Sequence, residues 1–289
     1  MSGEYGKELE VAIGAAKDAA ATVLDFYERA GAREYTKSDG SPVTDADLAS
    51  DKIIRRWLTE HFPDDGILTE EGADDHVRLA KSRVWIVDPI DGTQQFVERT
   101  GEFDVLIALA VEGSPKVGVL LQPTTGLMLA GAVGSGAWIG KGNERKLLHF
   151  KPVPENVGPR IVTSQWFGAP ESLPILDRVA KRLGSPEPFV TRVGIYVRNF
   201  VAPELEGEVL IGMEMKEGQG LGSEWDVAAA DIVVNEAGGC FTNLSGGRFS
   251  YNKPHVRNRG GFVLSPDPIT HERVLAALKP ELNEINNPS

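Results

Sequence analysis

The sequence has one cysteine, Cys240, and no long apolar run. A single thiol cannot form an internal disulfide, which suits a reducing compartment. The longest apolar run, near residues 105–111, is far shorter than the ~18 residues that a membrane-spanning helix requires. The N-terminus is acidic and amphipathic, so we expect no secretory signal. These absences predict a cytoplasmic protein that does not enter a membrane.

Positive charge is also scarce, since 30 Lys and Arg stand against 42 Asp and Glu, a formal net charge of −12. Long polyanions require a basic face, so we expect no binding to long nucleic acids. A small anionic substrate remains compatible with this charge if metal cations supply the local positive charge. The five histidines show no metal-ligand spacing, so no zinc site is predicted.

What is present is a periodic hydrophobic pattern. Apolar residues at helical spacing predict helices over residues 7–30 and about 45–61. Short apolar runs separated by glycine and proline between residues 67 and 139 are typical of a mostly antiparallel sheet. Three prolines within residues 151–159 indicate a domain junction.

Beyond this junction, strand and helix patterns alternate, with helices expected at about 171–183 and 226–237 and at the C-terminus. We therefore predict an N-terminal α+β domain over residues 1–152. A smaller C-terminal α/β domain is expected over residues 153–289.

The stretch WIVDPIDGT carries the most chemical information. Asp88 ends an apolar strand, and an isolated carboxylate is costly to bury, so a cation is required there. Asp91 comes round a proline turn to face the same point. Gly92 allows close backbone approach, and Thr93 stands where a helix can begin and offer its amides to a phosphate. Hard carboxylates beside an anion site favour Mg²⁺ and indicate phosphoryl transfer.

Other acidic residues lie where strands end or helices begin. They are Asp45 and Asp47 in SPVTDAD, Glu70 and Glu71 in ILTEEG, and Asp226 in EWDVAAAD. Each has a simpler interpretation when taken alone. Asp47 and Asp226 suit helix caps, Glu70 and Glu71 suit a solvated pair, and Asp-Pro and Asp-Gly are common in turns.

Taken together, SPVTDAD, TEEG, WIVDPIDGT and WDVAAADIVVNEAGG resemble, in order and separation, the Mg²⁺-dependent, lithium-inhibited phosphatases of the inositol monophosphatase superfamily. The resemblance covers about residues 37–265. It implies a layered αβαβα sandwich, with a mostly antiparallel N-terminal sheet and a smaller C-terminal α/β sheet.

The resemblance also implies ligands for two Mg²⁺ ions. Glu70, Asp88 and the backbone carbonyl of Ile90 would hold the first ion, and Glu70 would thereby take part in catalysis. Asp88, Asp91 and Asp226 would hold the second ion, so that Asp88 bridges the two. Such a pair of ions can activate a water and stabilise the leaving oxygen.

Further roles are implied for residues around the ions. Gly92 and Thr93 would offer amide hydrogens to the phosphate, and Asp47 with the Thr93 hydroxyl would orient and deprotonate the attacking water. For Glu71, a third, weaker metal held through water and a simple surface carboxylate remain alternatives. Asp45 has no counterpart in the family motif and receives no role.

The residues just after the shared aspartates bear on the substrate. Asp91-Gly92-Thr93-Gln94-Gln95-Phe96 matches neither the D-G-T-x-N-F of inositol monophosphatases nor the D-G-T-K-E-F of bisphosphate nucleotidases. The continuation GEFDVLIALAV, with a later QP, is similar to the nucleotidases. We therefore favour a 3′(2′),5′-bisphosphate nucleotidase that converts adenosine 3′,5′-bisphosphate to AMP and phosphate. Inositol 1-phosphate or another sugar phosphate remains the alternative substrate.

Tyr196 and Arg198 stand where the nucleotidases often carry a G-S-S-x-K-like stretch. Tyr196 would stack on a nucleoside and Arg198 would meet its second phosphate, although ordinary packing and surface roles remain open. A non-catalytic calcium-binding module is a remote alternative, because SDGSPVTDAD lacks the glycine and the closing glutamate of a calcium loop. Relatives imply a homodimer and inhibition by lithium.

Overall fold

The computed structural model describes residues 3–29, 32–37, 42–142, 144–164, 170–191, 207–215 and 222–286. Tyr196 and Arg198 therefore lie outside the described residues. The helices are α1 (Gly6–Arg29), α2 (Asp45–His61), α3 (Thr93–Val97), α4 (Leu173–Leu183), α6 (Glu224–Glu236) and α7 (Pro268–Asn286), with short 3-10 turns at Val77–Ala80 and Pro170–Ser172. Among the helices of these ranges, none is long and apolar enough to cross a membrane.

The larger sheet has seven strands within the described ranges. In spatial order they are β3 (Gly66–Thr69), β4 (Arg83–Asp91), β5 (Asp104–Val111), β6 (Ser114–Leu121), β7 (Leu127–Ala132), β8 (Gly136–Lys141) and β9 (Lys146–Leu148). All neighbouring pairs are antiparallel except β3 and β4. The predicted, mostly antiparallel sheet is therefore confirmed.

The smaller sheet follows it in the chain. Its spatial order is β11 (Phe189–Thr191), β10 (Arg160–Ser164), β12 (Glu208–Met213), β14 (Gly261–Ser265) and β13 (Cys240–Asn243). Strand β10 is parallel to both of its neighbours, whereas β14 is antiparallel to both of its own. A separate hairpin of β1 (Glu34–Thr36) and β2 (Pro42–Thr44) precedes α2.

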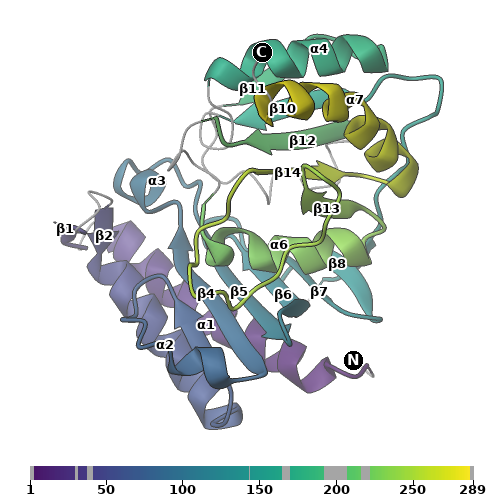
Figure 1. The fold of residues 1–289 in the computed structure, drawn as a ribbon. Coiled ribbons are helices and arrows are strands. Elements are labelled where there is room, and N and C mark those ends of the chain that lie inside the picture. The colour runs from purple at the N-terminus through teal and green to yellow at the C-terminus, as the bar shows by residue number, and fades with distance from the viewer. Residues whose placement is uncertain are drawn as a thin grey trace.

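Alternation along the strands explains the layers. Val84 and Ile86 of β4 belong to the core that contains α6, whereas Trp85 and Val87 belong to the core under α1 and α2, as expected for side chains on opposite faces of a sheet. Helix α6 also packs on strands of the smaller sheet, whose other face is covered by α4 and α7. Figure 1 shows this stack of helix and sheet layers. The predicted αβαβα sandwich is confirmed.

One glycine lets α6 approach the larger sheet. A Cβ atom at Gly118 of β6 would lie 2.4 Å from the Ala229 carbonyl oxygen of α6, so a larger residue would push the helix away. The predicted boundary between residues 152 and 153 falls in the connection from β9 to β10. Because both sheets share the core around α6, the division into two domains stays a prediction.

Candidate functional site

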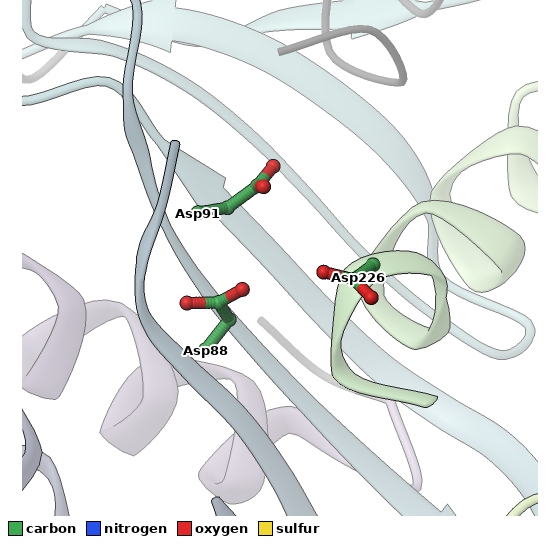
Figure 2. A group of neighbouring side chains, drawn as sticks. All are labelled: Asp88, Asp91 and Asp226. Atoms are coloured by element: carbon green, nitrogen blue, oxygen red, sulfur yellow. The ribbon is translucent and has the colours of Figure 1, made fainter. Parts of the chain in front are cut away.

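Two aspartates at the end of β4 and one aspartate of α6 meet between the larger sheet and α6 (Figure 2). One carboxylate oxygen from each of Asp88, Asp91 and Asp226 lies within 4.8 Å of the other two. Asp88 is buried, whereas Asp91 and Asp226 are partly exposed. The structure therefore brings together the two strand-end aspartates and the aspartate of α6.

The end of β4 is irregular at this point. Residues three apart on a regular strand point to opposite faces of the sheet, but the pairing of β4 with β5 shifts register between Asp88 and Asp91. The Ser50 hydroxyl of α2 donates a 2.9 Å hydrogen bond to the Pro89 carbonyl between them. The Ile90 N–H donates to Asp88 Oδ1 at 3.0 Å. This bulge allows both carboxylates to face Asp226.

Asp226 is placed by the start of α6. Ser223 is the N-cap, and its N–H donates a short hydrogen bond to Asp226 Oδ2, which completes a capping box. Gly222 has φ of 65°, and a Cβ there would lie 2.4 Å from the same carboxylate oxygen. The capping interpretation of Asp226 and its approach to the other aspartates are therefore compatible.

Asp47 is placed by the same kind of motif at the start of α2. Its Oδ2 accepts hydrogen bonds from the Thr44 N–H at 2.8 Å and the Thr44 hydroxyl at 2.6 Å. Its Oδ1 accepts a 3.0 Å hydrogen bond from the Thr93 hydroxyl at the start of α3. Thr93 Oγ1 also lies 3.2 Å from the Ile90 carbonyl oxygen. Asp47 and Thr93 are therefore joined directly, beside the strand-end aspartates.

Glu70 and Glu71 follow β3 and share one cation that the sequence analysis missed. Lys37 Nζ lies 2.7 Å from Glu70 Oε1 and 2.6 Å from Glu71 Oε1. Because Glu71 is held in this ion pair with a side chain only 5% exposed, it is not a simple surface carboxylate. The polar stretch TKSDG gave no sign of which carboxylates Lys37 would meet, because these contacts form only in the folded chain.

Crowded carboxylates give the site unusual electrostatics. Burial, followed by repulsion from Glu70 and Asp91, raises the pKa of Asp88 well above its usual value. Burial and then the charge of Glu70 raise the pKa of Asp226 to about 7. Burial also raises the pKa of Glu71, to about 7. A bound cation would relieve this repulsion.

The donor set fits a hard divalent cation. Asp88, Asp91 and Asp226 offer only oxygen atoms, the ligands that Mg²⁺ and Ca²⁺ prefer. The buried Asp88 carboxylate needs a compensating positive charge. The roles that the sequence analysis assigned to individual ligands, and to the amides of Gly92 and Thr93, stay predictions.

Asp45, which had no predicted role, is hydrogen-bonded to the first strand of the β1–β2 hairpin and to the residue before it. Its side chain accepts hydrogen bonds from the Arg33 N–H at 3.3 Å and the Tyr35 hydroxyl at 3.1 Å. The chain then reaches Lys37, two residues beyond Tyr35. Asp45 therefore positions the segment that carries Lys37 and does not belong to the carboxylate cluster.

Comparison with known proteins places these observations in a family. A model of the inositol monophosphatase family matches residues 5–282. The chain is 36% identical over 251 residues to a histidinol-phosphatase of Mycobacterium tuberculosis, covering 84% of this chain and 86% of that protein. It is 31% identical over 238 residues to the 3′(2′),5′-bisphosphate nucleotidase CysQ of Salmonella typhimurium, covering 82% of this chain and 90% of that protein.

A solved structure is also similar. CysQ from Bacteroides thetaiotaomicron, described as a bacterial member of the inositol monophosphatase family, superposes with a TM-score of 0.73 at 26% identity. The match covers 92% of this chain and 99% of that chain. Fold and sequence therefore indicate the same family.

Proposed function

Because the chain belongs to the inositol monophosphatase family and is a hydrolase of phosphoric monoesters, we propose that it is a Mg²⁺-dependent 3′(2′),5′-bisphosphate nucleotidase. It would convert adenosine 3′,5′-bisphosphate to AMP and phosphate. The observation that supports metal-dependent hydrolysis is the meeting of Asp88, Asp91 and Asp226 beside the joined pair of Asp47 and Thr93.

In this proposal, five groups would hold two Mg²⁺ ions. Glu70, Asp88 and the Ile90 carbonyl would hold one ion, and Asp88, Asp91 and Asp226 would hold the other. When bound, the ions supply Lewis acidity that neutralises charge on the transferred phosphoryl group and makes water more acidic. Glu71 and Lys37 lie at the edge of this cluster, where a third ion would have to displace the ammonium group.

The protein's own groups orient the reactants. The Thr93 hydroxyl donates its hydrogen to Asp47 Oδ1, so the free lone pairs of Thr93 Oγ1 can accept a hydrogen bond from the attacking water. Asp47 is then the group toward which the water's proton moves. Gly92, with φ of 93° before α3, lets the amides of Gly92 and Thr93 approach a phosphate oxygen.

Two features support a nucleoside bisphosphate as the substrate. The G-E-F segment at Gly101, Glu102 and Phe103 is similar to the nucleotidases, and a protein named as such a nucleotidase is 31% identical. Phe103 is fully buried against Phe96 of α3 and Tyr27 of α1, so this segment supports the helix that carries Thr93. Tyr196 and Arg198 remain proposed contacts to the nucleoside and its second phosphate.

Histidinol phosphate is a second candidate, because a protein named as a histidinol-phosphatase is 36% identical. The sequence motifs alone did not point to this substrate. Inositol 1-phosphate remains a third candidate through the family itself. All three esters would be cleaved by the same residues, so the choice depends on contacts outside the carboxylate cluster.

The decisive experiment measures phosphate release from these three substrates, first with Mg²⁺ and then with Ca²⁺. We expect the highest kcat/KM for adenosine 3′,5′-bisphosphate with Mg²⁺, inhibition by Ca²⁺ and Li⁺, and near-complete loss of activity in Asp91→Asn. A higher kcat/KM for histidinol phosphate would refute the nucleotidase proposal. Full activity of Asp91→Asn would refute the metal assignment itself. Light scattering would test the expected homodimer.

A further inference from the structure

Arg257 is held opposite the residue that caps α6. In the connection between β13 and β14, which runs past α6 (Figure 1), Arg257 forms an isolated antiparallel bridge with Ser223. Two hydrogen bonds flank this bridge, from the Glu224 N–H to the Val256 carbonyl at 2.9 Å and from Asn258 Nδ2 to the Ser223 carbonyl at 2.8 Å. The backbone of Arg257 is therefore fixed beside the start of the helix.

This position lies at the edge of the carboxylate cluster. The Ser223 N–H binds the Asp226 carboxylate, so Arg257 is paired with the residue that holds Asp226 in place. Arg257 and Lys37 are also close enough for their positive charges to interact with the Asp226 carboxylate. Two separate cations therefore lie within electrostatic reach of the site.

The two cations differ in what they already bind. Lys37 contacts both Glu70 and Glu71. Arg257 is exposed, and no hydrogen bond or ion pair joins its guanidinium group to another residue in the described part of the chain. A long, exposed guanidinium beside a reaction site is available to a ligand.

A bisphosphate substrate creates a need for such a group. The reacting phosphate would lie at the carboxylate cluster, so the second phosphate needs a positive charge of its own. The chain carries a net charge of −12, so that charge has to be local. A guanidinium group suits this task, because it binds phosphate through two parallel hydrogen bonds.

We propose that Arg257 binds the second, non-reacting phosphate of a nucleoside bisphosphate and thereby determines substrate specificity. This inference rests on the proposed nucleotidase function. Histidinol phosphate carries an ammonium group where the bisphosphate carries a second anion, so Arg257 disfavours it by charge repulsion. Sequence reasoning gave the second phosphate to Arg198 alone, and Arg257 adds a contact from a different segment.

The test compares two substrates that differ only in the second phosphate, adenosine 3′,5′-bisphosphate and adenosine 3′-monophosphate. The measured quantity is the ratio of their kcat/KM values in Mg²⁺. In Arg257→Gln we expect this ratio to fall about tenfold or more, because a charge-assisted hydrogen bond to phosphate is lost. The fall should appear in KM for the bisphosphate, and Arg257→Lys should lose less.

Arg259→Gln is the matched control, because Arg259 is an exposed arginine two residues away that pairs with Glu214 at 3.2 Å. It should keep the wild-type ratio. Calorimetric binding of the bisphosphate in Ca²⁺ gives a second readout, and Arg257→Gln should bind it about tenfold more weakly.

The outcomes separate the two proposals. A wild-type protein that cleaves the bisphosphate, combined with an unchanged ratio and unchanged binding in Arg257→Gln, would overturn the role of Arg257 alone. An equal fall in the control variant would also overturn it, because the effect would then reflect surface charge in general. A wild-type protein that does not cleave the bisphosphate would overturn the nucleotidase function and, with it, this inference.

Discussion

The starts of α2 and α6 use the same local motif on two sides of one site. Each helix begins with a hydroxyl residue at the N-cap, Thr44 or Ser223, and an aspartate three positions later, Asp47 or Asp226. In each case the aspartate accepts a hydrogen bond from the N-cap backbone. Locally, the two aspartates have equivalent positions.

Their surroundings give them different chemistry. Asp47 has both oxygens engaged by hydroxyl or amide donors, from Thr44 and Thr93. Asp226 faces other carboxylates, and burial with the charge of Glu70 raises its pKa to about 7. The capping motif therefore positions the carboxylate. Its neighbours in the folded structure decide whether it accepts hydrogen bonds from hydroxyl groups or binds a cation.

The largest effect is expected from Asp226→Asn. The amide can still accept the hydrogen bond from Ser223, so the helix cap is kept while the negative charge is removed. We expect kcat/KM to fall on the order of 10³-fold or more, because a metal centre contributes several kcal/mol of charge stabilisation. Circular dichroism controls for folding. Activity close to wild type would contradict the assignment of Asp226 to the metal site.

A smaller effect is expected from Asp47→Asn. This change keeps an acceptor for Thr44 but removes the carboxylate that the Thr93 hydroxyl contacts. We expect kcat to fall on the order of 10²-fold, the lower end of the loss expected for a general base. The Mg²⁺ concentration for half-maximal activity should change little. A large rise in that concentration, with kcat preserved, would instead assign Asp47 to the metal.

The stabilisation by Mg²⁺ should distinguish Asp226, at the start of α6, from Asp47, at the start of α2. At Mg²⁺ concentrations about 100 times its dissociation constant, the wild-type protein should gain about 2.7 kcal/mol in unfolding free energy over protein in a chelator. The gain should be smaller in Asp226→Asn, which loses a ligand of one of the two ions, and should remain in full in Asp47→Asn. Thermal unfolding of the three proteins, with and without Mg²⁺, measures this difference. Equal gains in both variants would contradict the proposed division of roles.

The smallest effect concerns Asp231, a carboxylate of α6 outside the cluster. Burial raises its pKa to about 6, although Arg248 and Tyr251 oppose the shift. The folded protein therefore binds more protons than the unfolded chain between about pH 4 and pH 6. Stability should fall as pH rises through this window, by at most about 1.4 kcal/mol per pH unit.

Asp231→Asn is the corresponding variant. The slope of unfolding free energy against pH, from denaturant titrations in a chelator, should be flatter in this variant than in the wild type. An identical slope would show that other groups dominate the pH dependence. The wild-type Asp231 accepts hydrogen bonds from Arg248 and Tyr251, both at 2.8 Å, so the variant should also be less stable overall.

The local features of the site could be predicted from the sequence. The helix expected over residues 45–61 matches α2, Asp45–His61, because Thr44 and Asp47 form a capping box and Phe62-Pro63 ends the pattern. The chain turn after the apolar strand placed Asp88 and Asp91 together because they are close along the chain. The resemblance to the phosphatase family then pointed to Asp226.

Contacts between distant segments could not be predicted in this way. Lys37 meets Glu70 and Glu71 more than 30 residues away, so the residue that follows β1 has to lie beside the residues that follow β3. Asp45 and Arg257 likewise gained roles only from their partners, Tyr35 and Ser223. Hydrophobic periodicity identifies which face of an element is buried, but it carries no information about which polar ends meet.

The sequence by itself determined the two capping motifs, the alternating strands and the acidic turn, because these depend on neighbouring residues and on backbone geometry. Only the tertiary structure decided that Asp226 faces Asp88 and Asp91 while Asp47 faces Thr93. The physical reason is that a carboxylate's chemistry depends on the charges and donors within a few ångströms, and in this fold those come from distant segments.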